Sequence, residues 1–289
     1  MTQMKGPVER VLARDQWVVA GAVGIIVVLA GLYTVWGVGM NMSALDMTRM
    51  AGATGQSMEM GMGSGMASET GPGMAMAMGA DWSWAYAGLI FLMWWIMMVA
   101  MMTPSAAPTL LLYTALKRQG SERERAVSLS LMFLSGYLLA WAGFSVVATT
   151  LQWATEAAGL TSTSMMTLSS RTAAGAVLIV AGLFQFSSLK SACLKHCRSP
   201  AHFLAQHRAR VAWGAMRIGM HHGTYCLGCC WALMALLFVG GIMNLYWIVG
   251  LALYVLAEKL VPYPRAFSQV TGAALLAAGL WVLGTRLAA

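Results

Sequence analysis

The run Tyr225-Cys226-Leu227-Gly228-Cys229-Cys230-Trp231 lies in an apolar window, residues 217–239, that is long enough to cross a lipid bilayer. Its cysteines follow at i, i+3 and i+4, so on a helix they share one face, with His222 one turn earlier. At about 100° per residue, these four side chains span an arc of roughly 100°. Thiolates and imidazoles are soft ligands for Cu(I), zinc and iron–sulfur centres, so the run predicts a metal site in an apolar helix.

The whole chain has the composition of a membrane protein. Of its 289 residues, 59% are hydrophobic and only 10% are charged, whereas soluble domains carry roughly 25% charged residues. We therefore predict an all-α, polytopic helical membrane protein with about seven transmembrane helices, since each apolar window is near the length that spans a bilayer. We expect the stretch from Gly240 to Asn244 to form a tight helical hairpin. The windows are 17–39, 82–103, 126–149, 171–191, 217–239, 242–258 and 266–285.

The lysines and arginines of the short loops predict the orientation, because these residues favour the cytoplasmic side. They place the N-terminus inside and the C-terminus outside. The first apolar window is too long for a signal-peptide core and is expected to be a retained anchor. The chain has a net charge of +8, and we expect its basic residues to contact anionic membrane lipid rather than nucleic acid. The basic residues of the internal segments are Lys5, Arg10, Arg14, Lys117, Arg118, Arg123, Arg125, Lys190, Lys195, Arg198, Arg208, Arg210, Lys259 and Arg265.

A methionine-rich segment follows the first apolar window. Residues 40–78 contain eleven methionines among Gly, Ala, Ser and Thr, and the charge rule makes this loop external. Thioether sulfur binds Cu(I) without forming disulfides in an oxidising compartment, so we predict weak copper binding; the alternative is a low-complexity linker. We thus divide the chain into an anchor (1–39), this loop (40–81) and a metal-handling membrane domain (82–289). The predicted loop ligands are Met58, Met60, Met62, Met74, Met76 and Met78.

Every cysteine and histidine of the chain lies between Cys193 and Cys230. Under the predicted topology these thiols are cytoplasmic or in the inner half of the membrane, where they stay reduced. A second cluster, Cys193, His196 and Cys197, repeats the spacing i, i+3, i+4 and is a further candidate site, as is His221. Incidental cysteines at a helix end are the alternative for that cluster, and His221 and His222 diverge by about 100° on a helix, which argues against one shared site.

Two features elsewhere in the apolar windows are ambiguous. Met97 and Met101, with Met93, form a stripe at four-residue spacing that either lines a path for a soft metal or provides flexible packing. We expect the second helix to break at the segment from Thr103 to Pro108. For the sequential pair Glu258-Lys259 we favour a self-paired interfacial dipeptide; the alternative is an inward-facing Glu258 that serves as a proton or metal site.

Several segments resemble those of the bacterial predicted metal-binding integral membrane proteins. They are Ala100-Met101-Met102-Thr103-Pro104, the run from Cys226 to Met234, the segment from Gly241 to Leu245, and Glu258-Lys259. The resemblance covers about residues 82–260, and the cysteine run is its most specific part. One member of that family is associated with copper delivery to a bacterial tyrosinase, so the resemblance implies copper handling at the cytoplasmic membrane.

These features predict a carrier rather than an enzyme, because no nucleotide-binding or phosphorylation motif appears. Our hypothesis is a membrane copper chaperone or copper-transfer protein that binds Cu(I), with zinc or haem as less favoured cofactors, and supplies a cuproenzyme or its assembly system. The alternatives are a membrane thiol–disulfide oxidoreductase, a haem-binding electron-transfer subunit and a structural subunit. Small-residue spacing at Ala273 and Ala277 permits close packing within one chain or in an oligomer.

Overall fold

The computed structural model describes residues 7–36, 45, 48, 82–162, 167–206 and 211–287, and their regular structure is almost entirely helical. The only strands in these ranges form a two-residue antiparallel pair, with Thr161 opposite Leu168. The prediction of an all-α chain is therefore confirmed for this part. The elements are α1 (Pro7–Trp36), α3 (Trp84–Gln119), η1 (Arg123–Arg125), α4 (Ala126–Ala157), β1 (Thr161–Ser162), β2 (Thr167–Leu168), α5 (Arg171–Gln185), α6 (Ser188–Arg198), α7 (Pro200–Gln206), α8 (Ala212–Met234), α9 (Leu237–Gly240), α10 (Leu245–Leu260) and α11 (Pro264–Leu287).

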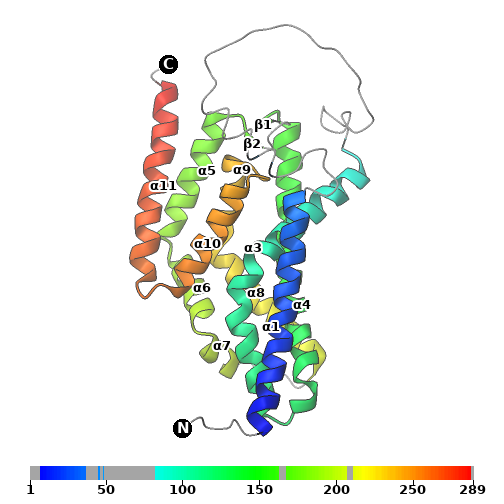
Figure 1. The fold of residues 1–289 in the computed structure, drawn as a ribbon. Coiled ribbons are helices and arrows are strands. Elements are labelled where there is room, and N and C mark those ends of the chain that lie inside the picture. The colour runs from blue at the N-terminus through cyan, green and yellow to red at the C-terminus, as the bar shows by residue number, and fades with distance from the viewer. Residues whose placement is uncertain are drawn as a thin grey trace.

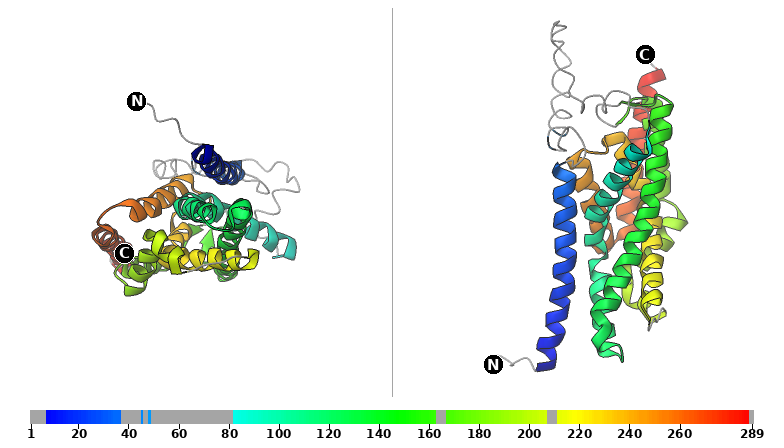
Figure 2. Two further views of the ribbon diagram at one scale, coloured as in Figure 1. Left: turned by 90° about the horizontal axis from the view of Figure 1, so that it is seen from below. Right: turned by 90° about the vertical axis from the view of Figure 1, so that its right-hand side faces the viewer.

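The helices run roughly along one axis and form an elongated bundle (Figure 1). Helix α4 packs along α8, α5 along α11, and α3 lies between α1 and α4. Seen along the axis, α1 and α11 lie at opposite edges of the bundle, while α8 lies against α4 (Figure 2). Helix α1 begins at the end of the bundle opposite to the end of α11 (Figure 1). The short α6, α7 and the start of α11 lie in the same half of the bundle.

The predicted count of seven transmembrane helices is not confirmed. Within the described ranges, five helices are long and apolar enough to cross a membrane, and a sixth span results if the pair α5 and α6 counts as one. That pair is bent by 63°, because α5 ends at Gln185 and Ser187 starts a new helix by accepting a hydrogen bond from the Lys190 amide. Helix α10 has only 16 residues, fewer than the ~20 that span a bilayer. The predicted break after α9 is confirmed, with Gly241 at a φ of 98° and Asn244 capping α10.

The predicted helix break from Thr103 to Pro108 is wrong. Helix α3 continues through Pro104 and Pro108 to Gln119. A proline inside a helix removes the hydrogen bond to the carbonyl four residues earlier, here those of Ala100 and Pro104, yet tertiary packing can hold the helix through it. Here the Met102 carbonyl accepts hydrogen bonds from the Ser105 Oγ at 2.9 Å and from the Tyr137 hydroxyl of α4 at 2.9 Å. Helix α3 therefore continues through both prolines, and the same stretch makes a polar contact with α4.

Glycines set the closest helix contacts. A Cβ at Gly219 of α8 would lie 1.8 Å from the Phe133 carbonyl oxygen, and one at Gly136 of α4 would lie 1.9 Å from the Met216 carbonyl oxygen. Only glycine allows the backbones of α4 and α8 to approach this closely. Helices α5 and α11 meet in the same way, since a Cβ at Gly182 would lie 3.0 Å from the Gly272 carbonyl oxygen. These contacts fix α8, which carries the cysteine run, against α4.

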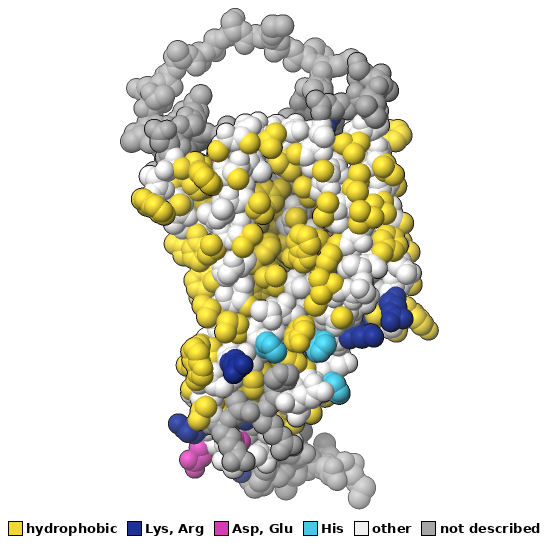
Figure 3. Space-filling model, turned by 180° about the vertical axis from the view of Figure 1, so that it is seen from behind, with side chains coloured by type: hydrophobic (Ala, Val, Ile, Leu, Met, Phe, Trp, Pro, Cys, Tyr) yellow, Lys and Arg dark blue, Asp and Glu magenta, His cyan; other side chains and the backbone are white. Residues whose placement is uncertain are grey.

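The outer surface of the bundle is largely apolar. Side chains such as Leu253, Val270 and Trp281 are exposed to 60%, 71% and 74% although they are large and hydrophobic. Figure 3 shows hydrophobic side chains spread over most of the visible face, with Lys, Arg and His side chains gathered towards its lower part. An apolar band with charged residues at its border is compatible with a membrane protein.

Candidate metal centre

The cysteine run forms part of α8, as the sequence predicts, and its three thiols are buried together. Cys226, Cys229 and Cys230 are exposed by no more than 1%. The thiols of Cys229 and Cys230 each donate a hydrogen bond of 3.0 Å to the Cys226 carbonyl oxygen, and the Cys230 thiol also interacts with those of Cys226 and Cys229. The spacing i, i+3, i+4 therefore brings these side chains together on the buried face of one helix.

Helix α6 adds a fourth thiol to this group. The Cys197 side chain interacts with the thiols of Cys226 and Cys229, which lie on α8. Cys193 lies one turn earlier on α6 and packs against Gly228, where a Cβ would lie 2.8 Å from the Cys193 Sγ. The two predicted cysteine clusters thus meet as one. We call Cys197, Cys226, Cys229 and Cys230 the thiol cluster, with Cys193 at its edge.

Lys259, which no spacing pattern in the sequence marks as a site residue, contacts this cluster. The Lys259 ammonium donates hydrogen bonds to the Cys226 Sγ at 3.2 Å and to the Ser105 Oγ of α3 at 2.8 Å. The Tyr137 hydroxyl lies 3.4 Å from the same sulfur. An ammonium beside a sulfur stabilises negative charge on it, and only the thiolate form of cysteine is a strong metal ligand. The cluster therefore includes one cation in direct contact with one of its sulfurs.

Glu258 and Lys259 do not pair with each other, so the predicted interfacial dipeptide is wrong. Glu258 is 1% exposed and forms an ion pair with Lys190 of α6, with 2.8 Å between Nζ and Oε1. Lys190 also donates to the Cys229 carbonyl oxygen at 3.2 Å. Consecutive residues on a helix point about 100° apart, which sends Glu258 to α6 and Lys259 to the thiols. The sequence signal for these contacts was the position of the ionisable residues at the ends of apolar windows, because charged groups in such windows are usually paired.

The candidate histidines are distributed differently from the cysteines. His222 is buried among the rings of Phe133, Tyr137 and Phe203, at centroid distances of 5.9, 5.9 and 5.5 Å. Its Nδ1 has no hydrogen-bond partner in the part of the chain that the structure describes. In contrast, His221 is exposed, and its ring packs edge-on against Tyr225 at 5.5 Å. The His196 ring stacks on the same Tyr225 ring, with 4.2 Å between the two ring centroids. Only His222 is therefore buried in the interior near the cluster.

The candidate methionines of α3 are buried, whereas those of the loop cannot be placed. Met97 and Met101 are exposed to 0% and 3%, and Ser105, which contacts Lys259, lies one further step of four residues along the helix. This stripe therefore runs towards the cluster. The candidate ligands Met58, Met60, Met62, Met74, Met76 and Met78 lie outside the described residues.

The thiol cluster does not have the arrangement of a preformed metal site. Within the described ranges, no group of three or more His, Cys, Asp or Glu side chains is placed to hold a metal ion. The hydrogen bonds of Cys229 and Cys230 to the Cys226 carbonyl explain this, because they turn two sulfurs towards the backbone. All five cysteines are free thiols, so the donor type suits a soft monovalent metal even though the geometry does not enclose one.

Comparison with known proteins places the chain in a family. No curated protein and no solved structure gives a significant match. A family model described as PpoB2, copper chaperone, matches residues 91–282. This match includes every cysteine, together with Ser105, Tyr137 and Lys259. Because it covers well over half of the chain, the protein belongs to the PpoB2 copper-chaperone family.

Proposed function

We propose that the protein is a membrane copper chaperone that holds Cu(I) at the thiol cluster and passes it to a cuproenzyme or to its assembly system. The observation that carries this proposal is the meeting of four cysteines from two helices, in a chain of a copper-chaperone family. Copper is the cargo in this proposal and no reaction is catalysed. The thiol–disulfide oxidoreductase, the haem subunit and a zinc site gain no support from the family.

The charges around the cluster favour a monovalent metal. Lys190 is paired with Glu258, so its charge is balanced, whereas Lys259 contacts a sulfur. A Cu(I) ion bound by two thiolates carries one net negative charge, and the ammonium of Lys259 balances it. A Zn²⁺ ion bound by the same two thiolates is neutral and leaves the ammonium unbalanced. Because unbalanced charge is costly in a buried site, we propose that Lys259 makes the cluster selective for Cu(I).

Binding requires rotation of at least some of the thiols. Cys229 and Cys230 each turn from the Cys226 carbonyl towards the metal, which is a change between staggered side-chain rotamers. The lost hydrogen bonds are weak, since a thiol is a poor donor. We propose Cys226 and Cys229 as central ligands with Cys197 and Cys230 as exchange partners, and buried His222 as an auxiliary ligand. Such readily rearranged ligands suit a carrier that must also release its metal.

We propose that the protein spans the cytoplasmic membrane with its N-terminus inside and its C-terminus outside. The five long apolar helices and the apolar outer surface support this placement. Met97 and Met101 then lead from the cluster towards the outer half, and the methionines of residues 40–78 exchange copper with an external acceptor. Reporter fusions at residues 65, 200 and 289 test the placement. A cytoplasmic signal from the fusion at 65 would contradict it.

Copper competition tests the cluster directly. The variant in which Cys226, Cys229 and Cys230 are replaced by Ser should lose tight Cu(I) binding, measured under reducing conditions against a chromophoric chelator. Serine keeps the size of the side chain but is a poor ligand for soft metals. As a folding control, the triple variant should have the same thermal unfolding temperature as the unchanged protein. Unchanged stoichiometry and affinity in a folded triple variant would remove the cluster from the proposal.

A further inference from the structure

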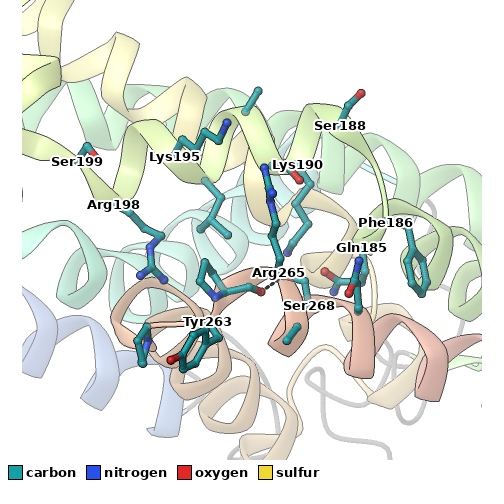
Figure 4. Close-up of a pocket in the computed structure, with 17 residues that line it drawn as sticks. Gln185, Phe186, Ser188, Lys190, Lys195, Arg198, Ser199, Tyr263, Arg265 and Ser268 are labelled. Carbon is teal, nitrogen blue, oxygen red and sulfur yellow. Dashed lines mark hydrogen bonds between the residues drawn. The ribbon is translucent and has the colours of Figure 1, made fainter.

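A pocket opens between α6 and the start of α11. Above it, α5 and α11 are held together at Gly182 and Gly272, and below Gln185 the chain bends by 63° so that α6 leans away from α11. The space that results has a volume of about 1020 Å³. Figure 4 shows the pocket with side chains entering from α6 on one side and from the beginning of α11 on the other.

The described residues that line this pocket include basic side chains and no carboxylate. Lys195 and Arg198 come from α6 and Arg265 from α11, and Lys190 lies at the back of the pocket. The charge of Lys190 is balanced by Glu258. Arg198 donates one hydrogen bond of 2.9 Å to the Glu258 backbone carbonyl and forms no ion pair within the described ranges. In Figure 4, the side chains of Arg198 and Arg265 extend from the two walls into the gap.

One buried polar side chain in the lining has no partner among the residues that the structure describes. Gln185 is only 3% exposed, and neither its Oε1 nor its Nε2 forms a hydrogen bond with any described residue. A buried amide without partners costs free energy, so its retention is explained if a ligand supplies the missing hydrogen bonds. Phe186, beside it, is half-exposed and gives this end of the pocket an apolar wall.

We infer that this pocket binds the phosphate headgroup of an anionic phospholipid. Guanidinium and ammonium groups bind phosphate strongly, the Gln185 amide suits the ester groups of the glycerol backbone, and Phe186 suits the start of an acyl chain. Basic pockets between membrane helices on the cytoplasmic side are places where such headgroups bind. The inference rests on the membrane placement proposed above but not on copper binding.

Native mass spectrometry of the purified full-length protein tests this inference, with phosphatidylglycerol and phosphatidylcholine as probes. The double variant Arg198→Gln, Arg265→Gln should retain phosphatidylglycerol roughly 30-fold less well, since each basic residue near an anionic headgroup contributes about a factor of five. The double variant Arg123→Gln, Arg125→Gln is the matched control, because it removes the same charge from exposed residues outside the pocket. Equal retention by both double variants would overturn the inference.

A second variant tests the role of the amide separately from charge. Gln185→Met is nearly isosteric and removes only the unpartnered polar group, so it should not lower the unfolding temperature in detergent but should weaken phosphatidylglycerol retention several-fold. Unchanged retention would remove Gln185 from the site. Displacement of the lipid by millimolar inorganic phosphate would mean a site for free anions and would overturn the assignment to lipid. A protein that does not enter phosphatidylcholine vesicles at all would refute the membrane placement instead.

Discussion

Replacement of Lys259 by Met should weaken Cu(I) binding by a factor of at least about 100. The attraction between two unit charges at the 3.2 Å that separate Nζ from the Cys226 Sγ is about 5 kcal/mol at an effective dielectric constant of roughly 20. Relaxation and entering water reduce this value, and the loss of one partner of a buried pair costs about 3–5 kcal/mol in other proteins. A loss of about 3 kcal/mol corresponds to a change in Kd of roughly 150-fold.

The assay is competition with a chromophoric Cu(I) chelator under reducing conditions, repeated for Zn²⁺ with a zinc indicator. Lys259→Met should lose Cu(I) affinity while its Zn²⁺ affinity changes little or rises, because the neutral zinc bis-thiolate does not need the ammonium. Lys259→Arg keeps the charge and should retain most of the Cu(I) affinity. This conservative variant separates the effect of charge from that of packing.

Two results would refute the reasoning about Lys259. One is an unchanged Cu(I) affinity in Lys259→Met, which would mean that the ammonium does not balance the charge of the metal complex. The other is an equal loss of Cu(I) and Zn²⁺ affinity in both Lys259 variants, which would make the residue a structural support for the helix contact with Ser105. The thermal unfolding temperature of each variant shows whether the fold is retained.

Cys197→Ser should weaken Cu(I) binding at least several-fold and more than Cys193→Ser does, because Cys197 contacts the thiols of both Cys226 and Cys229 whereas Cys193 has only a charge interaction with Cys229; equal effects in chelator competition would contradict this division of α6. Gly219→Ala should destabilise the protein by at least about 2 kcal/mol, since its Cβ would lie 1.8 Å from a carbonyl oxygen of α4, and Gly143→Ala, with nothing within 4 Å, is the matched control. Comparable unfolding temperatures for the two alanine variants would argue against tight packing at Gly219. Deletion of residues 55–78 should preserve folding and tight Cu(I) binding but lower cuproenzyme activity when copper is scarce; normal activity would make the loop a linker.

Local patterns allowed much of the fold to be predicted. Apolar windows and the spacing of the cysteines depend on residues near one another in the chain, so the helices and the shared face of Cys226, Cys229 and Cys230 follow from periodicity. Helix ends were less predictable. The sequence motif around Pro104 indicated a break, but α3 continues through both prolines while packed between α1 and α4, and such tertiary packing cannot be read from the motif itself.

The contacts that complete the candidate site depend on how distant segments meet. Cys197 and Lys259 approach Cys226 from helices that are 29 and 33 positions away in sequence, as their residue numbers show. No spacing rule connects residues at such separations. What the sequence did offer was chemical type, since thiols and an ionisable pair in apolar windows need partners. The chemical type of a residue does not determine which distant side chain becomes its partner.

The bend between α5 and α6 has consequences for both proposed sites. A straight continuation of α5 would keep its tight contact with α11 beyond Gly182, and the space lined by Arg198 and Arg265 would close. It would also move Cys197 relative to α8, because the position of that thiol depends on the direction of α6 after the bend. Any change that straightens this helix pair should therefore weaken copper binding and anionic-lipid binding together, whereas Arg198→Gln with Arg265→Gln should weaken lipid binding alone. Parallel measurement of both ligands on such variants distinguishes a shared dependence on the bend from two unrelated sites.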